Sequence, residues 1–166
     1  VGSDKALLVD LSNFIKWDDT AVASLQAVVA QEIGNRKLFI AVTHFHGDHT
    51  GMLPAFKDDR NVTFWIQTDE FKGRGLFPAE RTMPIAANPT LDLGGGFVVN
   101  ALEIPGHTDH STAYFLKGKN LLFTGDGVGC PTEVARDHSR DGAEGSRQGD
   151  GDSGDEHRVR KPGRHA

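Results

Sequence analysis

Histidine and aspartate side chains cluster between positions 44 and 49 of the chain. Four of these six residues are potential metal ligands, namely His44, His46, Asp48 and His49. Imidazole nitrogens and carboxylate oxygens are typical ligands of zinc, and they also suit iron or manganese. A polar loop with incidental histidines would not be expected to place four such groups at alternating and adjacent positions. The spacing therefore predicts a metal-binding loop.

The segment before this cluster is expected to direct its side chains toward one site. An apolar run over residues 38–42 predicts a buried strand, and the C-terminal end of such a strand is the usual place for an active site in α/β proteins. His44 and His46 point the same way if this strand end stays extended. Gly47 allows a tight turn, so the two residues after it can face a second metal beside the first.

The spacing H-x-H-x-D-H resembles the signature of the metallo-β-lactamase-fold hydrolases, and in particular their glyoxalase II-like branch. Two later elements extend the resemblance. A predicted strand over residues 97–104 ends in a Pro-Gly-His-Thr element that contains His107, and a predicted hairpin over 113–124 runs into a Thr-Gly-Asp element that ends at Asp126. The resemblance implies an α/β fold of the αββα sandwich type.

The resemblance also implies which residues bind metal: His44, His46, Asp48, His49, His107 and Asp126. One zinc ion is expected on the three histidines at positions 44, 46 and 107. A second is expected on Asp48 and His49, with Asp126 between the two ions. Iron or manganese could replace zinc at such a site.

The activity implied by the resemblance is hydrolysis by a metal-bound hydroxide, since a bound metal lowers the pKa of water to about 7. Asp48 and His49 are the expected catalytic pair, and they resemble the glyoxalase II-like branch rather than lactamases that carry Arg after the Asp. The expected substrate is a small acyl compound, a thioester first and an ester or lactam otherwise. No cysteine nucleophile is needed, so the single cysteine, Cys130, is interpreted as a bystander.

Two alternatives stay open at this point. The chain could be a catalytically incomplete fragment that binds metal without turnover, or an iron-dependent sulfur oxygenase on the same fold. His46 argues against the di-iron oxygen reductases, which usually carry Glu there. Nucleases share the H-x-H-x-D-H stretch, but a net charge of −5 argues against a broad contact with nucleic acid.

Two further polar residues lie near the expected site. Asp10 ends a predicted strand that begins at Lys5. In the family an aspartate here holds a ligand histidine in the correct tautomer, but an ordinary turn residue is an equally good interpretation. His110 could be a spare ligand or a substrate contact, although a solvent-facing loop histidine is the expected outcome.

The remaining elements are expected to be structural. An amphipathic helix is predicted over residues 19–33, a short helix starting at Thr50, and a strand over 62–66. Residues 72–90 contain two glycines and three prolines and are predicted as a loop, and the glycines at 94–96 as a turn. Three apolar side chains near this loop are expected to pack in the core rather than line a substrate pocket: Phe71, Phe77 and Met83.

The composition changes near residue 136. Residues 1–135 are expected to form a partial metallo-β-lactamase-like domain, and residues 136–166 a disordered low-complexity tail, because Val159 is their only apolar side chain larger than alanine apart from one proline. The motifs match the family only over residues 5–129, which suggests a truncated or frameshifted sequence after the bridging aspartate. None of the downstream histidines follows an apolar strand: His138, His157 and His165.

The sequence also limits location and partners. It has no run of 18 apolar residues and no basic start followed by an apolar segment, so neither a membrane span nor a signal peptide is expected. Cytoplasm is the default expectation, with a small-molecule substrate and no nucleic-acid partner. The oligomeric state is left open.

Overall fold

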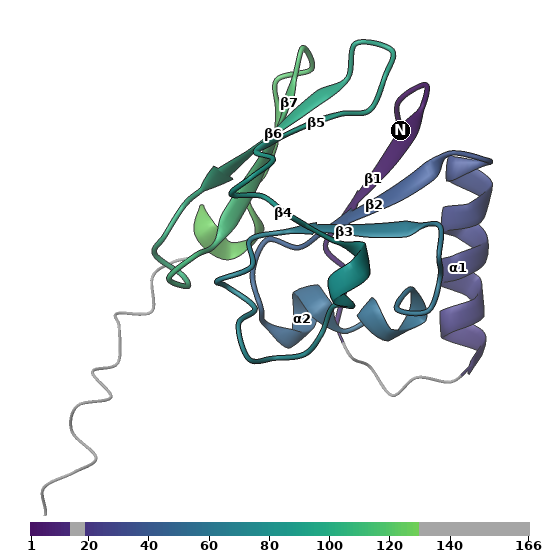
Figure 1. The fold of residues 1–166 in the computed structure, drawn as a ribbon, viewed down its shortest axis with the longest axis horizontal. Coiled ribbons are helices and arrows are strands. Elements are labelled where there is room, and N and C mark those ends of the chain that lie inside the picture. The colour runs from purple at the N-terminus through teal and green to yellow at the C-terminus, as the bar shows by residue number, and fades with distance from the viewer. Residues whose placement is uncertain (14–18, 130–166) are drawn as a thin grey trace, which may run out of the picture. The chain divides into compact units, whose positions relative to one another are not determined.

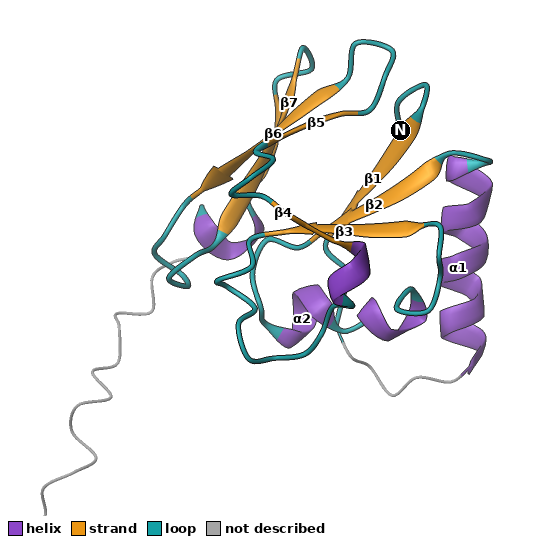
Figure 2. Cartoon of the chain, in the orientation of Figure 1, coloured by secondary structure: helices purple, strands orange, loops and turns teal. Residues whose placement is uncertain are grey.

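The computed structural model describes residues 1–13 and 19–129. Two four-stranded β-sheets form the framework of this part of the chain, with helices on the outer side of the first sheet (Figures 1 and 2). Cys130, the expected tail at 136–166 and its three histidines lie outside the described residues.

The first sheet is parallel and has the order β1-β2-β3-β4. Its strands are β1 (Lys5–Val9), β2 (Lys37–Ala41), β3 (Val62–Ile66) and β4 (Thr82–Pro84). The strands expected near residues 5, 38 and 62 are thus confirmed. Helix α1 (Asp19–Ile33) connects β1 to β2 and has the predicted bounds. Gly34 follows the last helical residue, and its φ of 56° is in the left-handed region that glycine adopts without strain.

Alternating side chains on the first sheet belong to two different cores, as the pleat of a strand requires. On β2, Leu38 and Ile40 face α1 and pack with its Val29. Phe39 and Ala41 point the opposite way, into the space between the two sheets. Both faces of β2 are therefore buried, which explains why its sequence is continuously apolar.

The second sheet is antiparallel and has the order β5-β6-β7-β8. Its strands are β5 (Thr90–Asp92), β6 (Val98–Glu103), β7 (Thr112–Lys117) and β8 (Leu121–Phe123). Strand β6 and the β7–β8 hairpin confirm the expected strand and hairpin, whereas β5 was not expected. The glycine turn at 94–96 joins β5 to β6, as predicted. Tyr114 on β7 packs against Trp65 on β3, with ring centroids 5.5 Å apart, and both side chains are fully buried between the sheets.

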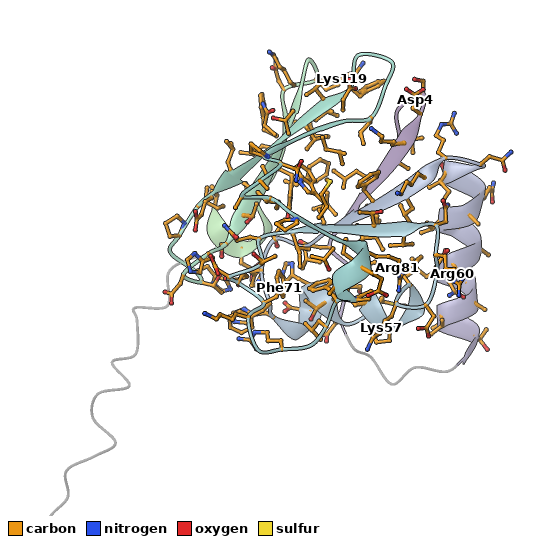
Figure 3. The ribbon with its side chains drawn as sticks, viewed as in Figure 1. Asp4, Lys57, Arg60, Phe71, Arg81 and Lys119 are labelled. Atoms are coloured by element: carbon orange, nitrogen blue, oxygen red, sulfur yellow. The ribbon has the colours of Figure 1, made fainter. Side chains whose placement is uncertain are left out.

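The prediction of a continuous loop over residues 72–90 is wrong. A 3-10 turn (Ala79–Arg81) leads into β4, which pairs with β3 in the parallel sheet. Arg81 fixes this turn, since its guanidinium donates to the backbone carbonyls of Lys57 and Asp59 (Figure 3). A strand of three residues that ends in proline is too short to show an alternating pattern.

The helix expected to start at Thr50 is also wrong in position. Helix α2 (Gly47–Thr50) begins inside the histidine stretch, and a separate 3-10 turn follows at Leu53–Ala55. Pro54 lies within that turn and disfavours α-helical geometry in the residue before it, so the two segments do not merge.

Phe71 and Phe77 pack in the core, as expected. Phe71 is buried, and its ring lies 4.9 Å from that of Phe77, which in turn contacts Phe64 on β3. The two side chains also form part of the wall of a hollow of about 290 Å³ on this side of the sheet. Met83 is partly buried and packs between the two sheets.

The observed layers are helix, sheet and sheet, in agreement with the expected α/β class. In residues 1–13 and 19–129, no α-helix lies on the outer face of the second sheet, where the αββα pattern has its fourth layer. The helices in these ranges are too short or too polar to cross a membrane.

Candidate metal centre

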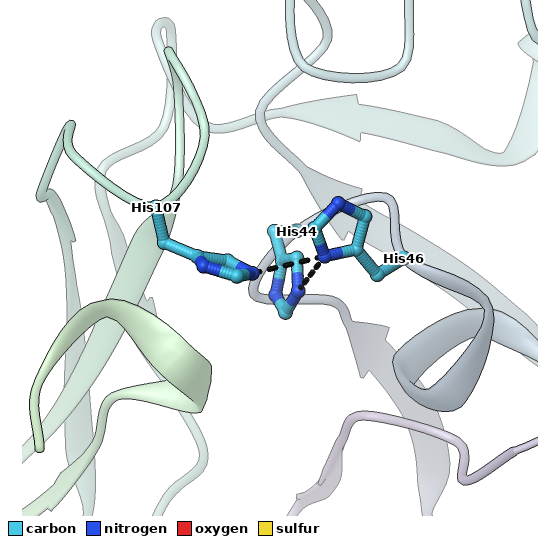
Figure 4. Close-up of side chains that lie close together, drawn as sticks. All are labelled: His44, His46 and His107. Carbon is cyan, nitrogen blue, oxygen red and sulfur yellow. Dashed lines mark hydrogen bonds between the residues drawn. The ribbon is translucent and has the colours of Figure 1, made fainter. Parts of the chain in front are cut away.

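Loops from both sheets meet at the candidate site. His44 and His46 follow β2 in the first sheet, whereas His107 lies in the loop between β6 and β7 of the second sheet (Figure 4). Asp126 lies in the 3-10 turn Gly125–Gly127, which follows β8. The carboxyl end of β2 thus supplies two imidazoles, and the second sheet supplies the groups that face them.

The first ligand group consists of His44, His46 and His107, whose ring nitrogens lie within 4.8 Å of one another. The Nδ1 atom of His46 lies 3.0 Å from Nε2 of His44 and 2.9 Å from Nε2 of His107. Nitrogen ligands of a tetrahedral zinc ion lie about 3.3 Å apart, given bonds of about 2.0–2.1 Å. The three imidazoles are therefore close to the spacing that a zinc ion requires, and their donor set suits it.

His44 lies at the bottom of this group and is only 1% exposed. Burial and, next in order of size, the neighbouring imidazoles of His49, His46 and His107 together lower its pKa from 6.5 to about 4. His44 is therefore neutral at pH 7 and has a lone pair that can bind a metal ion.

The second group consists of His44, His49 and Asp126. Asp126 Oδ1 lies 3.3 Å from Nε2 of His49, and its Oδ2 lies 3.5 Å from Nε2 of His107 and 4.0 Å from Nε2 of His44. Asp126 thus lies between the two histidine groups, at the place where a carboxylate could contact two metal ions.

Asp10 contacts the site directly. Its Oδ2 accepts a hydrogen bond from Nδ1 of His49 at 2.8 Å, and its two oxygens also accept from the backbone N–H and the hydroxyl of Thr43. Burial alone would lower the pKa of His49, but the bond to Asp10 and the charges of Asp10, Asp126 and Asp48 together raise it above 6.5. Of the two interpretations of Asp10, the structure favours the contact with a ligand histidine.

Two sequence-predicted candidates lie outside both groups. The side chain of Asp48 is 55% exposed, and its Oδ2 lies 3.7 Å from Nε2 of His49. His110 is 41% exposed and bonds to Glu103 at 2.7 Å, an interaction that raises the pKa of His110. His110 is therefore a surface histidine, as expected.

Glu70 is a residue near the site that the sequence patterns did not single out. It is buried and follows β3, and its carboxylate accepts hydrogen bonds from the loops of both sheets. The signal that could have revealed it is its position, because the carboxyl ends of neighbouring parallel strands meet at one edge of the sheet.

A family model described as the metallo-beta-lactamase superfamily matches residues 2–160. The chain belongs to the metallo-β-lactamase superfamily. The resemblance seen in the motifs is thereby confirmed, and the matched range is wider than the residues 5–129 over which the motifs were expected to agree. The α/β fold class of this superfamily agrees with the helix, sheet and sheet layers described above.

Curated members of the superfamily resemble parts of the chain. An atrochrysone carboxyl ACP thioesterase from Claviceps purpurea is 30% identical over 131 residues, covering 77% of this chain and 38% of the relative. A hydroxyacylglutathione hydrolase from Methylobacillus flagellatus, a glyoxalase II-like relative, is 34% identical over 95 residues, covering 55% of this chain and 35% of the relative. The chain thus spans little more than a third of the length of these two relatives.

Solved structures of superfamily members share the fold. A metallo-beta-lactamase from Staphylococcus aureus superposes with a TM-score of 0.54 at 19% identity, covering 75% of this chain and 35% of the other. An archaeal superfamily protein from Sulfolobus tokodaii gives a TM-score of 0.51 at 18% identity, covering 75% of this chain and 54% of the other. At these identities the likeness concerns the fold alone.

Proposed function

We propose that this chain is a metal-dependent hydrolase that acts on small acyl substrates, with a thioester as the preferred class. The observation that carries the proposal is the convergence of three imidazoles and Asp126 from both sheets, in a chain of a typically hydrolytic superfamily.

The proposed metal ligands rest on this geometry and, for Asp48, on the family resemblance of the motif. His44, His46 and His107 would hold one zinc ion, and Asp126 with His49 and Asp48 would hold a second. Zinc supplies Lewis acidity and brings the pKa of water down to about 7. Manganese or iron would suit the same donors.

The protein's own carboxylates would decide which nitrogen of His49 carries a proton and would accept a proton from water. Asp10 keeps the proton of His49 on Nδ1, which leaves Nε2 facing Asp126. Asp48 lies beside His49 on the solvent side, where its carboxylate can accept a proton from an attacking water. His49 and Asp48 are accordingly the proposed catalytic pair.

Two observations support an acyl substrate. Two relatives are named as an acyl-carrier thioesterase and a hydroxyacylglutathione hydrolase. A hollow of about 300 Å³ also begins at Gly47, within the ligand loop, and its wall includes Leu53, Pro54 and Leu76. This volume is at the lower end of the range for small-molecule sites, and its apolar wall suits the acyl part of a substrate.

The test is a zinc titration of the full chain followed by a panel of thioester, ester and phosphodiester substrates. We expect zinc-dependent hydrolysis that is fastest on the thioester. His46→Ala should lower the rate by about 100-fold or more, since changes even outside the ligand set cost about 10–100-fold. His110→Ala is the matched control, because it removes a nearby imidazole that lies outside both ligand groups.

Two results would overturn the proposal. One is a zinc-loaded chain that hydrolyses none of the three substrate classes. The other is bound iron together with oxygen consumption, which would indicate an oxygenase instead.

A further inference from the structure

We infer that Glu70 is a positioning residue that holds the two histidine loops against each other. This inference rests on the proposed metal centre and deepens it. Glu70 is 6% exposed and follows β3, so it belongs to the first sheet. Its carboxylate nevertheless contacts the loop of His107, which belongs to the second sheet.

Each ligand loop is bonded to Glu70 within three residues of a histidine ligand. The backbone N–H of Phe45, which lies between His44 and His46, donates to Oε1 at 3.1 Å. The hydroxyl of Thr108, next to His107, donates to the same oxygen at 2.8 Å. The backbone N–H of His110 donates to Oε2 at 3.2 Å.

The surroundings of Glu70 suit an ionised carboxylate. Its three neighbours all donate, and an ionised carboxylate is the side-chain group that only accepts hydrogen bonds. The hydroxyl of Ser111, which is also buried, lies 2.5 Å from that of Thr108, so Ser111 can donate to Thr108 while Thr108 donates to Glu70. A buried network in which every member has a partner holds its loops in one conformation.

A direct backbone bond also joins the two loops. The backbone N–H of Thr112 donates to the carbonyl of Thr43 at 2.8 Å. That bond joins Thr43, which is adjacent to His44, to Thr112 at the start of β7, whereas Glu70 reaches a residue adjacent to a histidine of the site in both loops. We therefore expect the separation of 2.9 Å between Nδ1 of His46 and Nε2 of His107 to depend on Glu70 more than on the Thr43–Thr112 bond.

The test is metal affinity measured on the full chain with zinc or Co²⁺ alone, together with the visible spectrum of the Co²⁺ form. Glu70→Ala removes all three bonds, and we expect it to lower affinity by about 10–100-fold and to alter the Co²⁺ spectrum. Glu70→Gln keeps one acceptor oxygen but turns an N–H₂ group toward a donor. Its metal affinity should therefore lie between that of the wild type and that of Glu70→Ala.

Variants at Thr108 keep the test informative if Glu70→Ala does not fold. Thr108→Val removes the hydrogen bond from Thr108 to Glu70 and keeps nearly the same side-chain shape, and it should lower metal affinity. Thr108→Ser restores the hydroxyl and should restore the affinity. Glu103→Gln is the matched control, since Glu103 also bonds to His110, but to its exposed imidazole rather than to the backbone N–H that donates to Glu70.

The outcomes separate this inference from the proposed function. Unchanged metal affinity and spectrum in folded Glu70→Gln and Thr108→Val, even with a lower melting temperature, would overturn the positioning role and leave the hydrolase proposal intact. A wild-type chain that binds metal but hydrolyses nothing would overturn the hydrolase proposal alone. A wild-type chain that binds neither zinc nor Co²⁺ would overturn both.

Discussion

His44 and His49 lie side by side, with ring centroids 4.1 Å apart, yet their pKa values shift in opposite directions. His44 is buried among other imidazoles, so its proton is lost easily. His49 is bonded to Asp10 and faces Asp126, and these carboxylates outweigh the effect of burial and retain its proton. The two histidines therefore differ in how readily they offer a lone pair to a metal ion.

Because the pKa values of His44 and His49 shift in opposite directions, we expect the two ligand groups to bind metal over different pH ranges. Because the pKa of His49 is raised, its proton stays bound above pH 6.5 and must be displaced by a metal ion. Binding to the group of His49 and Asp126 should weaken as pH falls through this raised pKa. The group of His44, His46 and His107 should keep its metal to lower pH. Zinc titrations at several pH values would measure how many zinc ions the chain binds at each pH.

Asp10→Asn isolates the cause of this pH dependence. Asp10 has a φ of 59°, a conformation that asparagine also tolerates, so the backbone need not change. Removing the negative charge should lower the pKa of His49 and move the pH midpoint for the second ion downward. An unchanged midpoint in this variant would contradict the assigned role of Asp10.

At the scale of elements, the 3-10 turn after β8 places Asp126 through a close backbone contact. Gly125 has a φ of 51°, and a Cβ atom there would lie 2.8 Å from Cβ of Thr43 and still closer to its hydroxyl. Thr43 itself is buried and bonded to Asp10. Only a residue without a side chain allows the turn to approach β2 this closely.

Gly125→Ala should displace Asp126 and weaken binding of the second metal ion. We expect a loss of about 1–2 kcal/mol from the left-handed backbone and a further ~1–3 kcal/mol from the steric overlap. Gly118→Ala is the matched control, because Gly118 also has a positive φ, of 85°, but no atom within 4 Å of its Cβ position. Chemical denaturation and zinc titration of both variants would separate backbone strain, which both variants should show, from steric overlap, which only Gly125→Ala should show. Equal losses of stability and of zinc affinity in the two variants would contradict the steric argument.

At the scale of the whole described unit, two kinds of contact join the sheets besides the hydrogen bonds of Glu70 and Thr43 described above. Apolar packing around Trp65 and Tyr114 fills the space between them, and the Tyr114 hydroxyl donates to the carbonyl of Val42 at 2.9 Å. The second kind is the ligand cluster, in which imidazoles from both sheets meet. A metal ion bound there would connect the sheets through ligands rather than through packing.

Metal binding should therefore stabilise the fold, and its removal should destabilise it. At a free metal concentration of 100 times Kd, the free energy of unfolding should rise by about 2.7 kcal/mol. Thermal unfolding with zinc and with a chelator would measure the difference. His107→Ala should reduce the gain, since it removes the imidazole that the second sheet contributes to the first group, whereas His110→Ala should retain it. An equal gain in both variants would place the metal elsewhere.

Much of the site could be predicted from local pattern. The spacing of His44, His46 and His49 after an apolar strand, and the short elements around His107 and Asp126, identified the superfamily because each ligand directly follows a strand. Helix α1 and strands β1, β2, β3, β6 and β7 could be predicted for the same reason, since hydrophobic periodicity over five or more residues indicates which side chains are buried. Helix α2 was misplaced and strands β4 and β5 were missed because they span only four and three residues.

Only the tertiary structure decided how these residues meet. It brings His107 to within 2.9 Å of His46 across 61 positions of sequence, and it leaves Asp48 at the exposed edge of the site. Glu70 has no distinguishing neighbours in sequence, and its role arises because β3 ends between two loops that come from different sheets. Sequence spacing reports which groups follow one strand, whereas contacts between sheets depend on packing that no single segment encodes.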